Sequence, residues 1–217
     1  MTTFIYLHGF ASSPGSAKGR ELAARFAAIG AELRLPDLNA PDFAHLTVSA
    51  MIERARAEIA STQGVPAGPA HLIGSSLGGL VALHTAAREE RVASLVLLAP
   101  AIDFAANRRA TMGDEALRRW RESGWHEFYN YRDGAPRPVH HGLLEDAAGY
   151  DSAGLDLDLP ILIIHGTRDE SVSHEQSVAW AAGRPNVTLR LPDADHGMLG
   201  EIDSIWRELE DWYRDKG

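Results

Sequence analysis

Ser76 stands in the sequence Gly74-Ser75-Ser76-Leu77-Gly78, between a short apolar run and an apolar segment with helical character. A Gly-x-Ser-x-Gly sequence between a strand and a helix is typical of a nucleophile elbow, a sharp turn that exposes the serine hydroxyl above a sheet. Glycines are needed on both sides because a Cβ there would collide with neighbouring backbone. The pattern predicts a nucleophilic serine, although the same letters also fit a tight turn with a capping serine.

A serine hydroxyl is a weak nucleophile near neutral pH, so it needs an imidazole to accept its proton and a carboxylate to orient that imidazole. His196 lies in a glycine-containing loop after the last predicted strand and is the candidate base. The alternative interpretation is that His196 is an ordinary solvated histidine. Asp169 and Asp103 each follow a strand and are candidates for the acid. We prefer Asp169 because it lies in a tight turn directly after a strongly apolar strand.

The backbone around the serine could also stabilise charge. Leu77 would open the helix, so its N–H lacks a helical acceptor and points, with the positive end of the helix dipole, to where a carbonyl oxygen becomes negative. His8 ends the first apolar run, and we expect it to hold the turn there rather than to take part in catalysis. Glu170 is next to Asp169 but is expected to point elsewhere.

Apolar runs alternate with amphipathic segments along most of the chain, and such alternation predicts a parallel sheet with right-handed crossovers. The expected class is α/β, with a mostly parallel central sheet flanked by helices. Reactive groups in such a sheet gather beyond the carboxyl ends of its strands. Strands are expected at 4–7, 33–35, 71–75, 92–98, 161–164 and 187–191, and helices after Ser16, from Thr47 to a break at 64–66, after Ser76, after the capping box Ser173-x-x-Gln176, and over 202–213.

Residues from about 103 to 158 break this rhythm, and we predict that they form a cap inserted into a single domain of residues 1–217. One short helix is expected in it, over 115–120. Its aromatic residues either roof the serine or pack the cap onto the body, and they are Trp120, Trp125, Phe128, Tyr129 and Tyr131. Its clustered arginines either bind an anionic part of a substrate or form a solvated helix face, and they are Arg108, Arg109, Arg118, Arg119 and Arg121.

The composition limits partners and cofactors. The 217 residues carry 30 acidic and 21 basic side chains, a net charge of −9, which disfavours nucleic acid or an anionic membrane as partner. The absence of cysteine excludes disulfides and thiolate chemistry. No zinc-protease motif or phosphate loop occurs, and the pair His140-His141 is not expected to bind a metal. We expect a cytoplasmic monomer that acts on a small molecule without a cofactor.

The order Ser76, Asp169, His196 resembles that of the α/β-hydrolase superfamily over essentially the whole chain. More narrowly, the opening Tyr6-Leu7-His8-Gly9-Phe10, the segment Ser12 to Lys18 and the elbow look like the small YqiA-like bacterial esterases. The elbow and residues 169–172 are also similar to the mitochondrial acyl-thioesterase and acyl-glucuronidase branch.

This resemblance implies a serine carboxylesterase or thioesterase that acts on a small acyl ester, with the N–H of Phe10 as the second oxyanion donor beside that of Leu77. Carbon–carbon bond hydrolysis and peptidase action on the same fold stay open, because a fold does not choose the leaving group. A further alternative is a ligand-binding protein whose triad is dormant.

Overall fold

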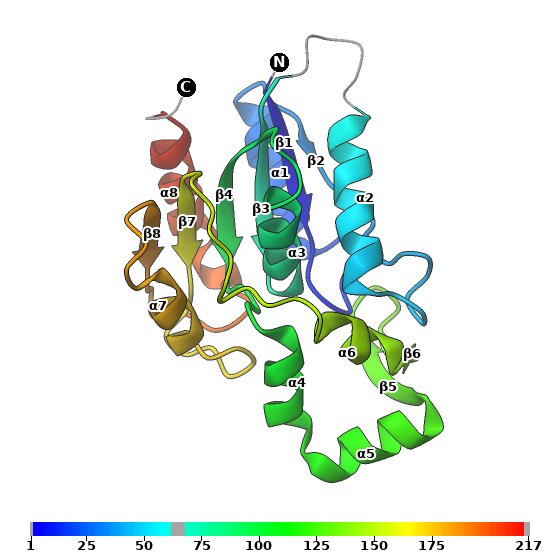
Figure 1. The fold of residues 1–217 in the computed structure, drawn as a ribbon. Helices are drawn as coiled ribbons and strands as arrows, with labels where there is room; N and C mark the ends of the chain where they lie inside the picture. The colour runs from blue at the N-terminus through cyan, green and yellow to red at the C-terminus, as the bar shows by residue number, and fades with distance from the viewer. Residues whose placement is uncertain (1, 62–67, 215–217) are drawn as a thin grey trace.

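The computed structural model describes residues 2–61 and 68–214, and the helix break expected at 64–66 lies outside them. Within these residues, six parallel strands form the central sheet in the order β2-β1-β3-β4-β7-β8 (Figure 1). This confirms the predicted mostly parallel sheet, with the last strand at its edge. The strands are β1 Thr3–Leu7, β2 Leu33–Arg34, β3 Ala70–Ser75, β4 Val92–Leu98, β7 Ile161–Ile164 and β8 Val187–Arg190.

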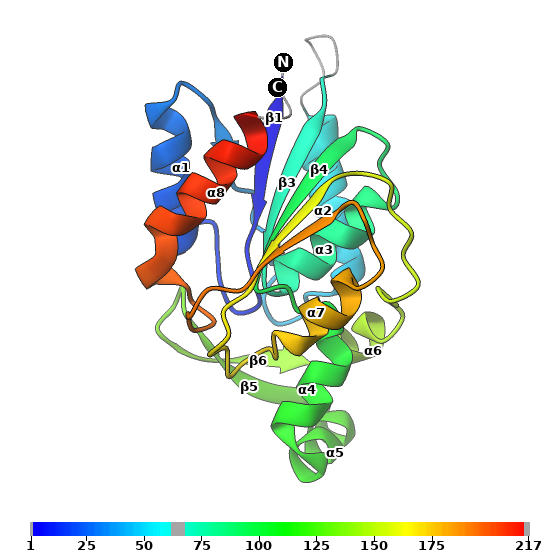
Figure 2. The same ribbon diagram turned by 90° about the vertical axis from the view of Figure 1, so that its left-hand side faces the viewer.

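Helices cover both faces of the sheet (Figure 2). On one face lie α1 Ala17–Ala28 and α8 Ile202–Arg214, and on the other lie α2 Val48–Ala60, α3 Leu77–Ala86 and α7 Glu175–Ala181. Ser16 caps α1 and Thr47 caps α2, each accepting a hydrogen bond from a backbone N–H of the first turn. The capping box at Ser173 does not form. Ser173 Oγ accepts from the N–H of Glu175, the N–H of Gln176 donates to the carbonyl of Ser173, and Gln176 Oε1 has no hydrogen-bond partner among the described residues.

The apolar run of β4 shows why the central strands lack polar alternation. Leu95 and Leu97 pack into the core under α2 and α3, whereas Val96 and Leu98 pack into the core under α1 and α8. Successive side chains of a strand point to opposite faces, so a strand that is covered on both faces must be apolar at every position.

The segment between β4 and β7 lies beyond the carboxyl ends of these strands (Figure 1). It contains α4 Phe104–Met112, α5 Asp114–Ser123, the hairpin strands β5 Trp125–Asn130 and β6 Ala135–His140, and α6 Gly142–Ala147. The expectation of one short helix here was therefore wrong. Trp120 of α5 is fully buried and donates from Nε1 to the carbonyl of Val139 at 2.9 Å, which ties α5 to the hairpin.

Hydrogen bonds attach this segment to the body at several points. The N–H of His140 donates to the carbonyl of Ala44, and the N–H of Tyr131 donates to the carbonyl of Ala11. On α6, Asp146 accepts a hydrogen bond from the backbone of Ser49. The loop after β1 and the turn of the hairpin are therefore held side by side.

The free energy of unfolding is expected to depend on pH because α3 contains a buried histidine, His84. Burial, together with the charge of Arg88, lowers the pKa of His84 to about 4, whereas an unfolded histidine titrates near 6.5. As the pH falls from about 6.5 to 4, the unfolded chain binds a proton that the folded chain resists. The free energy of unfolding measured in urea is therefore expected to fall over this window, and to be independent of His84 above it.

The variant His84→Gln should reduce this loss, because glutamine is neutral and can still hydrogen-bond to Ser152, which lies 3.0 Å from His84 Nε2. The exposed His45 offers a matched control, and His45→Gln should keep the wild-type dependence on pH. Equal slopes in wild type and His84→Gln would contradict the assignment. The measurement is a series of urea titrations between pH 7 and 4.5.

Candidate active site

Ser76 lies at the sharp turn between β3 and α3, with φ 54° and ψ −118°. Positive φ is strained for a residue with a Cβ, and the turn persists because both flanking glycines allow close approach. A Cβ on Gly78 would lie 2.0 Å from the carbonyl oxygen of Leu7, and one on Gly74 would lie 2.4 Å from that of Gly78. The backbone therefore has the geometry of the predicted elbow.

The structure brings Ser76, His196 and Asp169 together. Ser76 Oγ lies 3.1 Å from His196 Nε2, and His196 Nδ1 lies 2.7 Å from Asp169 Oδ2. An ionised carboxylate only accepts hydrogen bonds, so Nδ1 carries the proton and Nε2 is free to accept from the serine. The two loops meet closely, since a Cβ on Gly166 would lie 2.2 Å from the carbonyl oxygen of Ala194.

Asp169 is held as a buried carboxylate. Its Oδ1 accepts hydrogen bonds from the N–H groups of Ser171 at 2.9 Å and Val172 at 2.8 Å. Burial alone would raise the pKa of Asp169, but hydrogen bonds from His165, His196 and Val172 outweigh it and bring the pKa well below its ordinary value. The carboxylate is therefore charged at neutral pH and fixed in orientation.

His165 is a second histidine on this carboxylate, and the sequence analysis gave it no role. It is fully buried, and its Nε2 lies 3.1 Å from Asp169 Oδ2 and 3.0 Å from the carbonyl oxygen of Val172. Both partners accept only, so Nε2 carries the proton, while Nδ1 accepts from Ser177 Oγ at 2.7 Å. A histidine that ends an apolar strand four residues before the acid was the available signal.

The other acidic residues and histidines considered from the sequence all lie in the described part of the chain and form no side-chain hydrogen bond with Ser76 or His196. Asp103 caps α4, and its carboxylate accepts from the N–H of Ala106 at 2.9 Å. Glu170 is exposed. His8 is buried and holds the loop after β1, as expected: its Nε2 accepts from the N–H of Leu38 at 3.0 Å, and its Nδ1 donates to the carbonyl of Gly9 at 2.9 Å.

The two proposed oxyanion donors lie beside Ser76. Leu77 is the first residue of α3, so its N–H has no acceptor within the helix. Phe10 lines the same cavity as Ser76, and a Cβ on the preceding Gly9 would lie 3.1 Å from Ser76 Cβ. The loop after β1 therefore packs directly against the elbow.

A cavity of about 980 Å³ opens over Ser76 and His196. Of the five aromatic residues noted in the inserted segment, Tyr131 lines it. Phe128 instead packs edge-on against Phe10 with ring centroids 5.0 Å apart, and Trp120 is buried beneath it. Phe128 therefore packs the inserted segment onto the body, whereas Trp125, Tyr129 and Tyr131 are exposed.

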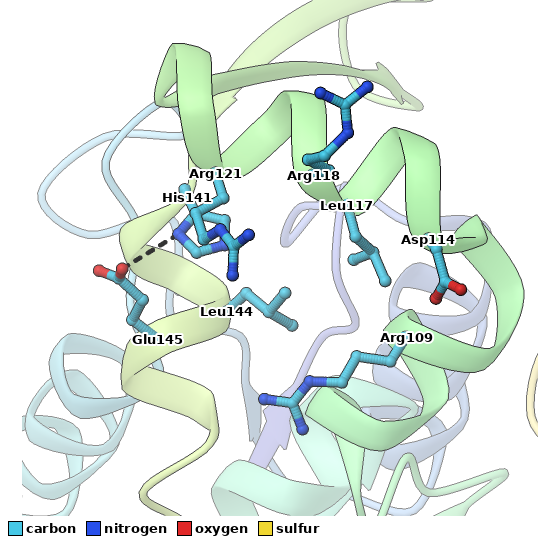
Figure 3. A pocket seen from close by; sticks show the side chains of 8 residues that line it. All are labelled: Arg109, Asp114, Leu117, Arg118, Arg121, His141, Leu144 and Glu145. Atoms are coloured by element: carbon cyan, nitrogen blue, oxygen red, sulfur yellow. Dashed lines mark ion pairs between the residues drawn. The ribbon is translucent and has the colours of Figure 1, made fainter.

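None of the five arginines noted in the inserted segment is among the described residues that line this cavity. Arg118 pairs with Glu122 and Arg119 with Glu115 along the exposed face of α5, as a solvated helix face requires. A separate cavity of about 320 Å³ lies between α4, α5 and α6 (Figure 3), and its lining residues are Arg109, Asp114, Leu117, Arg118, Arg121, His141, Leu144 and Glu145.

The histidine pair of this segment is engaged in local contacts. His141 forms an ion pair with Glu145 at 3.2 Å, and His140 Nδ1 accepts from the N–H of Gly142. In residues 2–61 and 68–214, no group of three or more histidine, aspartate or glutamate side chains is arranged to hold a metal ion. Over the same residues, no helix has the length and apolar character needed to cross a membrane.

A family model described as "Uncharacterised protein family (UPF0227)" matches residues 3–209. The chain belongs to this family. The match confirms the resemblance to the α/β-hydrolases and, within them, to the YqiA-like branch.

Curated relatives and solved structures agree with this placement. The chain is 29% identical over 143 residues to the rat palmitoyl-protein thioesterase ABHD10, a mitochondrial protein, with 63% of this chain and 48% of that protein covered. It therefore spans about half the length of the curated relatives it matches. The mouse α/β-hydrolase domain-containing protein 10 superimposes with a TM-score of 0.81 at 22% identity, over 99% of this chain and 90% of that chain.

Est1E from Butyrivibrio proteoclasticus, with ferulic acid bound, superimposes with a TM-score of 0.84 at 19% identity, over 99% of this chain and 89% of that chain. At such identities these superpositions establish the fold. The chain thus has the α/β-hydrolase fold that the order of its strands and helices predicted.

Proposed function

We propose that this protein is a serine hydrolase that cleaves small acyl esters or thioesters through an acyl-enzyme intermediate. The observation that carries the proposal is the hydrogen-bonded series from Ser76 Oγ through His196 to Asp169, with distances of 3.1 and 2.7 Å. A strained serine at the start of a helix, within reach of an imidazole that a buried carboxylate orients, is the arrangement that acyl transfer requires.

In the proposed reaction Ser76 Oγ attacks the substrate carbonyl while His196 Nε2 takes its proton. The N–H groups of Phe10 and Leu77 hold the oxyanion that forms. His196 then gives the proton to the leaving alcohol or thiol, and Asp169 stabilises the imidazolium in the meantime. Water attacks the acyl-enzyme with His196 as base, which releases the acid and restores the serine.

The printed names of the relatives bear on the substrate class. ABHD10 is named a palmitoyl-protein thioesterase, and this supports including thioesters in the proposal. A cavity of about 980 Å³ suits a small substrate. A cytoplasmic location and a monomeric state belong to the same proposal. So does the lack of a nucleic-acid or anionic-membrane partner, which the net charge of −9 supports.

An ester screen with active-site labelling tests this function. Wild-type protein should hydrolyse p-nitrophenyl esters of graded chain length, and a fluorophosphonate probe should modify Ser76, as located by peptide mass spectrometry. Ser75→Ala should keep the label and Ser76→Ala should lose it. Labelling without turnover of any ester or thioester would favour the dormant binding protein, and labelling elsewhere would overturn the mechanism.

A further inference from the structure

Lys18 occupies an unusual place for a lysine. It lies in the first turn of α1, is 8% exposed, and lines the cavity that contains Ser76. Among the described residues no carboxylate lies within ion-pair distance of its ammonium group, and the hydrogen bond that Nζ makes is donated to Ser75 Oγ at 3.2 Å. Ser75 is the residue before the elbow serine.

This position is unfavourable for a cation in three respects. The ammonium is removed from water without a carboxylate partner, which costs free energy. It also lies at the positive end of a helix dipole. The negative charges of Asp169 and Asp195 act on it from beyond ion-pair distance, and burial outweighs them and lowers the pKa of Lys18 to about 8.

The surroundings of Lys18 supply further hydrogen-bonding groups. The Tyr6 hydroxyl lies against the hydroxyls of Ser75 and Ser16, and all three residues line the cavity with Lys18. Gly19 allows this close packing, because a Cβ there would lie 2.9 Å from Ser16 Oγ and 3.1 Å from the Tyr6 ring. Arg20 and Arg132 also line the cavity, and the lining carboxylate, Asp37, is paired with Arg132 at 3.1 Å.

We propose that Lys18, with the hydroxyls of Tyr6 and Ser16, forms an anion subsite beside Ser76 that binds a carboxylate of the substrate. The proposal rests on the hydrolase function above and names its substrate class. A buried ammonium that lacks a carboxylate partner gains one when an anionic substrate enters, so its unfavourable burial becomes binding free energy.

The location limits where the substrate carries this charge. Lys18 Nζ donates to the side chain of Ser75, and Lys18, Ser75 and Ser76 line the same cavity. The proposal therefore places the carboxylate in that cavity, near the scissile carbonyl. The charge can come from the acyl group, as in a half-ester of a dicarboxylic acid, or from the alcohol, as in an ester of a hydroxy acid.

Matched esters test the subsite. For the acyl side, p-nitrophenyl hemisuccinate is compared with p-nitrophenyl butyrate, and for the alcohol side, 3-(butyryloxy)benzoate is compared with phenyl butyrate. In Lys18→Met, kcat/KM for the anionic ester of one pair should fall about ten- to hundredfold, since a hydrogen bond to a charged group contributes about 1.5–3 kcal/mol. The neutral ester of that pair should change less than about threefold.

Two further variants sharpen the comparison. Lys18→Arg keeps the charge and should retain most of the preference for the anionic ester. Arg118→Gln removes one positive charge from α5 at a residue that does not line this cavity, and should leave the ratio between the esters unchanged. The pair that responds to Lys18→Met identifies which side of the ester carries the carboxylate.

The outcomes separate the subsite from the hydrolase function. If wild type hydrolyses none of these four esters and no other ester or thioester, the proposed function fails. If it hydrolyses the neutral esters but Lys18→Met changes both members of each pair equally, the subsite is overturned and Lys18 acts through Ser75. Protection of Ser76 from the fluorophosphonate by succinate, lost in Lys18→Met, is a second expected result that does not depend on turnover.

The pH profile supplies another readout. Because the pKa of Lys18 is about 8, the free enzyme loses this cation as the pH rises from 7 to 9.5, and kcat/KM for the anionic ester should fall relative to the neutral one. Lys18→Arg should keep the ratio constant. A constant ratio in wild type would contradict the assignment. The other titratable or charged groups around the site are Tyr6, Arg20, Asp37, Arg132, Asp169, Asp195 and His196.

Discussion

Ser76→Ala is expected to lower kcat for an activated ester such as p-nitrophenyl butyrate by about six orders of magnitude, the scale on which hydrolases of this kind lose turnover when the nucleophile is removed. The reason is local, because the substitution deletes the hydroxyl oxygen that lies 3.1 Å from His196 Nε2. Alanine keeps the Cβ, so the elbow is otherwise unchanged. The residual rate is measured in stopped assays at high enzyme concentration. The variant is purified on materials that have not been used for wild type, so that no active enzyme is carried over.

Ser76→Gly is a control for Ser76→Ala, because it removes the same hydroxyl but differs in backbone strain. Its φ of 54° strains alanine as much as serine but not glycine, and such strain is of order 1–3 kcal/mol. Ser76→Gly should therefore be as inactive as Ser76→Ala but more resistant to urea. Activity near the wild-type level in either variant would remove Ser76 from the mechanism, and equal stability would show that the turn is not strained.

The elbow was predictable because its requirements are local. Gly74 and Gly78 are fixed by contacts within a few residues and with the end of β1, and an apolar strand followed by an apolar helix is readable in the sequence. Asp169 and His196 were then predictable from their places after late strands, because a parallel sheet brings those ends together. Their order in the sequence thus predicted that the three side chains would meet, while Asp103, which also follows a strand, was the alternative acid.

The inserted segment was less predictable because its elements depend on tertiary contacts. A proline lacks the N–H that a strand donates, yet Pro136 and Pro138 both lie in β6, which pairs only with β5 among the described strands and so tolerates missing N–H donors. Trp120 is buried because it packs against the hairpin, a contact that the spacing of apolar residues in α5 does not predict.

Two residues near Ser76 have places in the site that the sequence did not predict. His165 reads in the sequence as the end of an apolar strand, and its role depends on the fold of the next loop, which turns Asp169 back toward its ring. Lys18 reads as an exposed residue in the first turn of an amphipathic helix. Only the packing of α1 against β1 shows that it is buried beside the elbow. Burial of a charged group cannot be read from composition or periodicity.

Asp169→Asn is expected to lower kcat/KM by about three to four orders of magnitude with little change in folding. If the asparagine carbonyl oxygen keeps the hydrogen bonds from Ser171 and Val172, its NH₂ faces His165 Nε2 and His196 Nδ1. The NH₂ group can only donate, so His196 must accept at Nδ1 and carry its proton at Nε2. That tautomer cannot take the proton of Ser76.

Asp103→Asn is the matched control, because Asp103 was the alternative acid and the charge change is identical. Its carboxylate caps α4 through the N–H of Ala106, and asparagine caps helices as well as aspartate does, so activity and stability should both stay near wild type. The measurement is kcat/KM for p-nitrophenyl butyrate in both variants, with urea titrations alongside. Loss of activity in Asp103→Asn together with near-normal activity in Asp169→Asn would reverse the assignment of the acid.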